Sequence, residues 1–122
     1  MTKKTILAAS AALLLAATAA SADPVHYVWN GTGINAMGAT KCPTYKMAID
    51  VTVDGTAVKG LFQQEGRYQR HFETTLDAKG TFKTKAQLGG GGTMDVAGSI
   101  SGNDGKIVLD GYCKFEGKLT KK

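Results

Sequence analysis

Hydrophobic and polar residues alternate along most of the chain after residue 22. In "YKMAIDVTV" (45–53) the apolar side chains occupy the odd positions, and Lys, Asp and Thr occupy most of the even ones. A period of two is typical of a β-strand with one buried face. The segments "FKTKAQL" (82–88) and "MDVAGSI" (94–100) show the same pattern. No helical period is evident in this part of the chain, so we expect an all-β fold.

Turn-forming residues separate the alternating segments. Asp-Gly pairs occur in "VDGT" (53–56) and "GNDGK" (102–106), and this pair favours two-residue hairpin turns. Together the two patterns predict eight strands, at 25–31, 44–53, 56–64, 67–76, 81–88, 93–101, 105–110 and 112–120. Consecutive strands joined by tight turns predict a small antiparallel up-and-down β-barrel, whose closure removes exposed edges. A β-sandwich is the alternative.

Two features depart from this regular pattern. Residues 32–41 fit no strand, and we expect them to form a loop that covers one end of the barrel and is pinned by Cys42. The chain also holds 16 glycines, which suits a tightly curved sheet. Among them, Gly60, Gly98 and Gly117 fall within predicted strands, where we expect bends.

The N-terminus has the pattern of a secretory signal peptide. Lys3 and Lys4 precede an apolar stretch at 6–20, and small residues at 20–22 supply a cleavage site before Asp23. The apolar stretch is shorter than the ~20 residues that span a bilayer, so we expect cleavage and no membrane span. The predicted organisation is therefore a cleaved peptide at 1–22 and one β-barrel domain at 23–122, in the periplasm or secreted.

The remaining charge is small. Removing the two signal-peptide lysines leaves 13 basic residues against 10 acidic ones, which lowers the net charge from +5 to +3. A nucleic-acid-binding surface needs a concentrated stripe of Lys and Arg. We therefore expect no nucleic-acid partner.

Both cysteines lie in the part of the chain predicted to be exported. Two cysteines in an oxidising compartment allow one pairing, so we predict a disulfide between Cys42 and Cys113. A small domain has a thin core, and the disulfide is expected to contribute strongly to its stability. A reactive thiol or metal pair is the alternative, although neither cysteine has a close Cys or His neighbour in the sequence.

Several short motifs resemble those of a known group. The order "WNG" (29–31), "CPTY" (42–45), "DGTAVKG" (54–60) and "GYCKFEGKL" (111–119) is similar to a family of small uncharacterised secreted bacterial β-domains. The late segment differs from that family, which more often has an aromatic residue where Leu119 stands. The resemblance implies a β-domain with one disulfide, and it implies no activity.

The segment "RYQRHF" (67–72) holds the strongest candidate for chemistry. In a strand over 67–76, Tyr68, Arg70 and Phe72 face inward, whereas His71 faces solvent. An arginine keeps its charge and is costly to bury without a partner. Arg70 is therefore either satisfied by nearby carbonyl or carboxylate groups, or binds an anion at the barrel end with Tyr68 and Phe72, or is turned outward by a shift in register.

Other chemistry has little support in the sequence. The two histidines, His26 and His71, could ligate metal or haem, but isolated histidines on strands are usually solvated, so we expect no metal and no cofactor. No G-x-S-x-G motif occurs, and paired cysteines leave no thiol nucleophile. We expect a protein without enzymatic activity.

Three functions remain. The leading hypothesis is a domain that binds a protein partner, such as an inhibitor of a secreted hydrolase, by fold-level analogy with small single-disulfide barrels. The alternative is a carrier of a small anionic or apolar ligand at the barrel end around Arg70. The third is an envelope structural protein. A barrel filled by its own side chains favours the first, and a large interior cavity favours the second.

Overall fold

The computed structural model describes residues 23–122, so the predicted signal peptide lies outside the described residues. The elements in chain order are β2 (Val25–Thr32), β3 (Ile34–Asn35), the 3-10 turn η2 (Cys42–Thr44), β4 (Lys46–Asp54), β5 (Ala57–Gln64), β6 (Arg70–Thr75), β7 (Thr81–Gln87), β8 (Thr93–Ser101), β9 (Asp104–Asp110) and β10 (Cys113–Lys121). Each of the eight predicted strands is present. The described residues contain no helix long and apolar enough to cross a bilayer.

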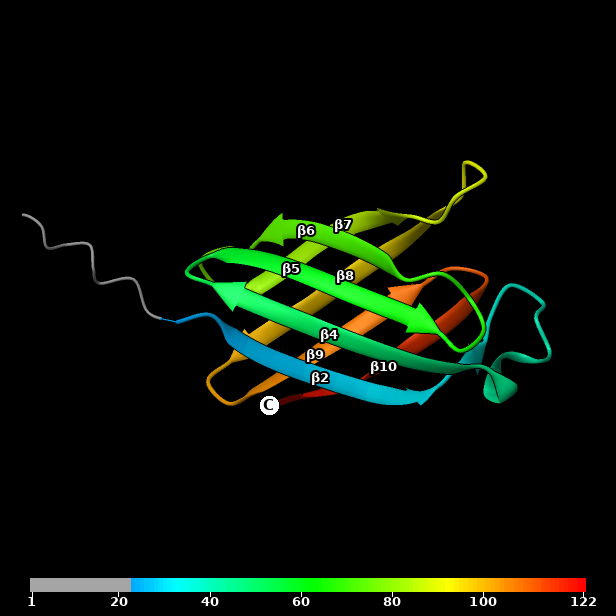
Figure 1. Ribbon diagram of the computed structural model, residues 1–122, viewed down its shortest axis with the longest axis horizontal. Helices are drawn as coiled ribbons and strands as arrows, with labels where there is room; N and C mark the ends of the chain where they lie inside the picture. Colours follow the sequence, from blue (N-terminus) through cyan, green and yellow to red (C-terminus); the bar gives the residue numbers. More distant parts are fainter. Residues whose placement is uncertain (1–22) are drawn as a thin grey trace, which may run out of the picture.

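The strands form one antiparallel sheet that curls into a nearly closed barrel. Their order is β6-β5-β4-β2-β10-β9-β8-β7, and the short strand β3 also pairs with β10. Neighbours in the sheet are also successive in the chain, except that β3 lies between β2 and β4 in the sequence and that β2 pairs with β10 and joins the two ends of the domain. The up-and-down barrel predicted from the sequence is therefore confirmed (Figure 1).

The closure is less complete than expected. Backbone ladders join seven pairs of neighbouring strands along the path from β6 to β7, but no ladder joins β6 to β7 themselves. We call the boundary between these two strands the seam. The expectation that barrel formation removes every exposed edge was therefore wrong at this one position.

The two ends of the barrel differ. At the turn end lie the tight connections of β4–β5, β6–β7 and β8–β9, together with both ends of the described chain (Figure 1). At the loop end lie residues 33–45, 65–69, 88–92 and 111–112, which include the longest connection. The predicted loop lies at this end; it contains the two-residue strand β3 and is followed by the turn η2, and neither was expected from the sequence.

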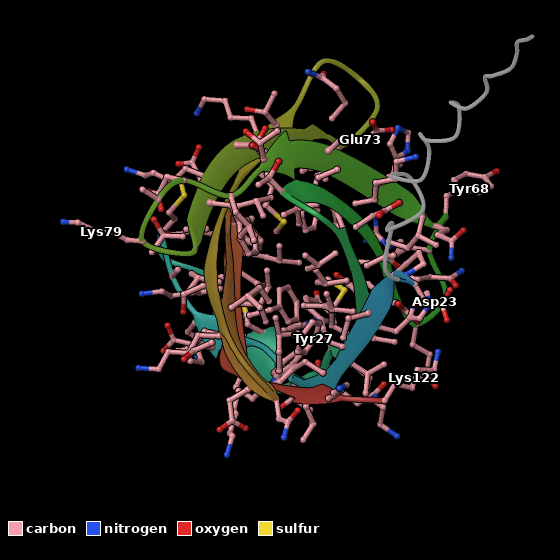
Figure 2. All side chains as sticks on the ribbon, turned by 90° about the vertical axis from the view of Figure 1, so that its left-hand side faces the viewer. Asp23, Tyr27, Tyr68, Glu73, Lys79 and Lys122 are labelled. Atoms are coloured by element: carbon pink, nitrogen blue, oxygen red, sulfur yellow. A yellow bond between two sulfur atoms is a disulfide. The ribbon has the colours of Figure 1, made fainter. Side chains whose placement is uncertain are left out.

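Apolar side chains fill the barrel (Figure 2). The alternating residues of β4 supply Met47, Ile49, Val51 and Val53 to one contiguous core, as their spacing predicts. No polar or charged side chain is buried among residues 23–122. Burial of apolar area at about 25 cal/mol per Å² is therefore the main stabilising term inside the barrel.

Aromatic rings lie against glycines on neighbouring strands. Phe72 is opposite Gly60, and a Cβ at Gly60 would come within 2.1 Å of the Phe72 ring. Phe82 has the same relation to Gly98, at 2.3 Å, and Trp29 covers Gly117, at 1.9 Å. The three strand glycines predicted at bends therefore have a more specific role, because each leaves room for a ring to lie across the sheet.

Candidate functional site

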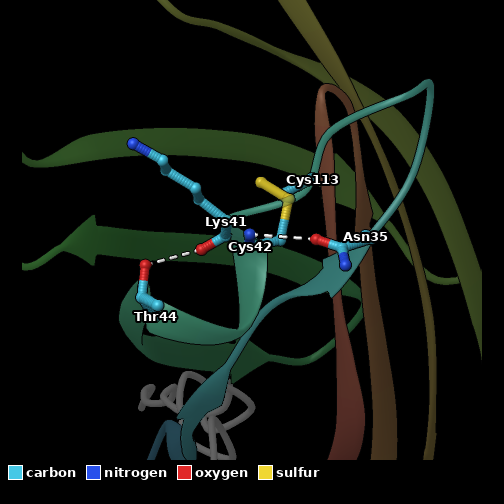
Figure 3. The surroundings of a disulfide bond; sticks show 5 residues. All are labelled: Asn35, Lys41, Cys42, Thr44 and Cys113. Atoms are coloured by element: carbon cyan, nitrogen blue, oxygen red, sulfur yellow. Dashed lines mark hydrogen bonds between the residues drawn. A yellow bond between two sulfur atoms is a disulfide. The ribbon is translucent and has the colours of Figure 1, made fainter.

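The long loop at the loop end is anchored at its base by the disulfide. Cys42 and Cys113 are bonded as predicted, with their Cα atoms 5.6 Å apart. The Cys42 N–H donates to the side-chain oxygen of Asn35 at 3.0 Å, and the Thr44 hydroxyl donates to the Lys41 carbonyl at 2.6 Å (Figure 3). These bonds fix the base of the loop, and the tip of the loop projects from this base.

Met37 lies at the tip of this loop. It is 80 % exposed and has a positive φ of 50°, which is uncommon for a residue other than glycine. Ala39, two residues further on, is buried, so the backbone turns sharply between an exposed and an anchored position. An exposed methionine held in a sparsely populated conformation points to a role other than core packing.

Tyr112 adds a second exposed apolar side chain at the same end. It lies in the β9–β10 turn and is 64 % exposed. The next residue, Cys113, pairs with Asn35, and Lys114 pairs with Ile34, which is also exposed. This register brings the β9–β10 turn and the start of the long loop to adjacent positions.

The three residues predicted to bind a ligand do not act as one group. Tyr68 precedes β6, is 81 % exposed and projects away from the barrel (Figure 2), so its predicted inward orientation was wrong. The reason is that β6 begins at Arg70, and the inward-outward alternation applies only from there. Phe72 does face inward but is 2 % exposed and stacks on Phe82, with ring centroids 6.1 Å apart. It is a core residue, and it also lines a surface hollow that Arg70 lines.

Arg70 lies at the rim and is partly buried. It pairs with the buried Phe62, so its side chain begins on the inner face of the sheet, as predicted. Its guanidinium carbon is 5.9 Å from the centre of the Tyr68 ring, within the range of a cation–π contact. On another side it approaches Gly89, where an added Cβ would be 3.2 Å from both terminal nitrogens. No salt bridge within residues 23–122 includes Arg70.

The histidines are placed apart from one another. His71 is exposed on β6, as the alternation predicts. His26 is exposed on β2 and lies 3.0 Å from the Thr52 hydroxyl through its Nδ1 atom. Within the described part of the chain, no three His, Cys, Asp or Glu side chains are grouped as a metal site would require.

The hollows on the described residues are surface features. They measure about 290 to 580 Å³ and are lined mainly by outward-facing side chains or by the rim. One of them, of about 440 Å³, lies along the seam and includes Arg70, His71, Glu73, Lys85, Gln87 and Gly89 among its lining residues. Arg70, the strongest candidate from the sequence, therefore lines an accessible space, which we call the seam hollow.

Sequence reasoning did not identify Met37 and Tyr112 as candidates for protein recognition. Met37 belongs to the one long segment without a strand pattern, and Tyr112 lies between a glycine and a disulfide cysteine at a predicted strand start. The alternation of strands predicts which face of a strand is buried, and it gives no information on apolar side chains in turns and loops such as these.

Comparison with known proteins gives no relative. No protein-family model, no curated protein and no solved structure matches the chain. The functional inference therefore depends on the chemistry and geometry of the described residues.

Proposed function

We propose that the protein is a non-enzymatic domain of the periplasm or extracellular space that binds a protein partner through its loop end. An inhibitor of a secreted hydrolase is a function of this kind. The observation that carries the proposal is the contrast between a filled interior and an end that exposes large apolar side chains. These are Met37, Tyr68 and Tyr112.

The composition of the loop end suits protein recognition. Aromatic residues, Met and Arg are enriched in the cores of protein interfaces, and Tyr and Arg are frequent among the residues that dominate affinity. Arg70, at the start of β6, lies beside Tyr68 on the β5–β6 connection. The turn end lacks such residues and carries polar turns instead.

The filled interior disfavours an internal carrier. A small-molecule site needs a concave apolar space with a few polar groups to orient the ligand. The barrel core contains no buried polar side chain within 23–122, and the five main hollows of this part of the chain are lined chiefly by outward-facing or rim residues. A small anionic ligand therefore has only the rim around Arg70 available to it.

The test is affinity capture from the envelope fraction of the producing cell, together with native mass spectrometry of the purified protein. The double variant Tyr68→Ala, Tyr112→Ala removes two loop-end aromatics. Leu61→Ala is the matched control, because Leu61 is also a large exposed apolar residue but lies on the outer wall of β5. We expect the double variant to lose at least tenfold in affinity for the captured protein, since interface aromatics often contribute more than about 1.4 kcal/mol each.

Two results contradict the proposal. One is a protein that is captured equally by the double variant and the unmodified chain. The other is a stoichiometric small molecule that co-purifies with the protein and accounts for its mass, which favours a carrier.

A further inference from the structure

The facing edges of β6 and β7 carry backbone groups with no ladder partner. The Leu76 N–H donates to the Thr56 carbonyl at 2.8 Å, and the β5–β6 register is regular up to Arg70. In an antiparallel ladder the backbone groups of alternate residues point to opposite sides. The even residues of β6 therefore bond to β5, and the N–H and C=O groups of His71, Glu73 and Thr75 point into the seam.

The same reasoning applies to β7. The Ile100 N–H donates to the Gly80 carbonyl, and the β7–β8 register continues without interruption to Gln87. The even residues of β7 thus bond to β8, while Lys83, Lys85 and Gln87 direct their backbone groups toward β6. Unpaired backbone groups of this kind retain their capacity for hydrogen bonding.

The hydrogen bonds that cross the seam lie near the turn end. The Asp77 N–H donates to the Thr81 carbonyl at 2.9 Å where the connection closes, and the Thr74 hydroxyl donates to the Lys83 carbonyl at 3.3 Å. Toward the loop end the seam hollow lies between the two strands. This half of the seam is where the backbone donors of His71 and Gln87 are available.

The charges at this half favour an anion with a single negative charge. The Lys85 ammonium pairs with Asp95 on β8, so it is already compensated. Arg70 has no salt-bridge partner in residues 23–122 and is held between the Tyr68 ring and the Gly89 backbone. Glu73 also lines the hollow, and its negative charge opposes a dianion such as phosphate.

We propose that the loop-end half of the β6–β7 seam is a carboxylate-binding site, in which the Arg70 guanidinium and the seam-facing backbone N–H groups receive a carboxylate of the protein partner. A guanidinium binds a carboxylate through two parallel hydrogen bonds, and charge-assisted bonds of this type are among the strongest in proteins. This inference rests on the proposed function, since it names the chemistry by which the loop end would recognise its partner. The carboxylate is either an Asp or Glu side chain or the partner's C-terminus.

The experiment is an NMR titration of the ¹⁵N-labelled protein with three probes. N-acetyl-glutamate amide carries only a side-chain carboxylate, N-acetyl-leucine carries only a main-chain carboxylate, and N-acetyl-glutamine amide is the neutral control. We expect saturable shifts of the Arg70 Nε–H and of the His71 and Gln87 amide signals with at least one acid, with a Kd on the order of 1 mM or weaker for so small a ligand. The acid that binds more tightly identifies the source of the carboxylate.

Matched variants separate this site from general charge attraction. Arg70→Met should abolish the saturable shifts, and Arg70→Lys, which keeps the charge but lacks the planar fork, should weaken binding at least tenfold. Arg67→Met removes an exposed arginine on the same connection and should leave the Kd unchanged within a factor of two. Spectra of each variant that retain the dispersed core signals show that the barrel is folded, and Arg70→Lys serves if Arg70→Met does not fold.

The other outcomes of these experiments decide separately on the carboxylate-binding site and on the proposed function. Shifts that persist in folded Arg70→Met, that keep the unmodified Kd in Arg70→Lys, that occur equally with the neutral probe, or that disappear equally in Arg67→Met overturn the site. Capture of a partner that depends on Tyr68 and Tyr112 but is unaffected by the Arg70 variants overturns the site and leaves the proposed function standing. Carboxylate binding at Arg70 without any captured partner supports the site and contradicts the proposed function.

Discussion

Two boundaries between strands complete the barrel, β2–β10 and β6–β7, and they differ in their backbone pairing. The β2–β10 boundary joins the first and last strands, with Thr120 opposite Val28 at a separation of 92 residues, and it is closed by backbone pairing. The β6–β7 boundary joins strands that are successive in the chain, and no ladder closes it. Proximity in sequence is therefore not what decides which strands of this barrel pair.

Side chains explain the difference. At the β2–β10 boundary the Lys122 N–H donates to the His26 carbonyl at 2.8 Å, and the Trp29 side chain on β2 lies over Gly117 on β10. At the seam, Phe72 and Phe82 stack in the core beneath the gap in the ladder. The core is continuous at both boundaries, but only the β2–β10 boundary also has backbone pairing, in a short ladder at Thr120 and Lys121.

Among the tests of this comparison, removing the disulfide should cause the largest loss in the free energy of unfolding. The variant Cys42→Ala, Cys113→Ala opens a loop with a sequence separation of 71 residues. The chain-entropy relation gives a loss of about 4 kcal/mol in the free energy of unfolding, which urea denaturation measures. Because Cys113 lies at the start of β10, amide exchange should increase more in β3 and β10 than in β6. A loss below about 1 kcal/mol, or uniform exchange, would contradict this expectation.

Alanine at the ring-covered glycines should separate the two boundaries. Gly117 pairs with Ile107 on β9, and β10 is also held by β3 before Gly117 and by β2 after it, so the clash of a new Cβ with Trp29 has no easy relief. Gly60 faces Phe72 on β6, and β6 can move because its other edge is unpaired. Overpacking typically costs 1–3 kcal/mol, so we expect about 3 kcal/mol for Gly117→Ala and about 1 kcal/mol for Gly60→Ala. Equal losses in urea denaturation would show that the seam is as rigid as the closed boundary.

Asp77 should make the seam sensitive to acid. The Thr81 hydroxyl, followed by backbone N–H groups of the turn, donates to its carboxylate and holds the pKa of Asp77 below its ordinary value of 3.8. A depressed pKa in the folded state contributes stability above about pH 3.8, and this contribution is lost as the pH falls through the folded pKa. Asp77→Asn should lower the Tm near neutral pH and reduce its acid dependence. A variant whose Tm keeps the full acid dependence would assign that dependence to other carboxylates.

The mildest test is hydrogen exchange of the unmodified protein, because it changes no residue. Amides of Phe72 and Thr74 bond to β5 and should exchange slowly, whereas those of His71 and Glu73 point into the seam and should exchange faster. On β10, the amides between Lys114 and Thr120 pair with β9 on alternate residues and serve as the closed reference. Uniform protection along β6 would indicate that the seam is closed in solution.

Much of the fold could be predicted from the alternation of residues. The bounds of β4, for example, differ from those expected by two residues at the start and one at the end, because Met47 to Val53 alternate without interruption. Tyr68 could not be placed in the same way, since the period of two gives no information on where a strand begins. The site was therefore predicted in part: Arg70 was identified, whereas its neighbours Gly89 and Lys85 come from a strand and a loop that only the folded barrel brings close.

By itself, the sequence determined the all-β class, the eight strands, the inward faces and the one disulfide pairing, because each depends on residue type at a local spacing or on a count of two cysteines. The tertiary structure decided which edges pair, which aromatic ring covers which glycine, and where Arg70 meets an accessible space. These are properties of curvature and of contacts between residues far apart in the chain, so no local pattern encodes them. The unpaired seam is the clearest instance, since the pattern of its two strands is that of an ordinary hairpin.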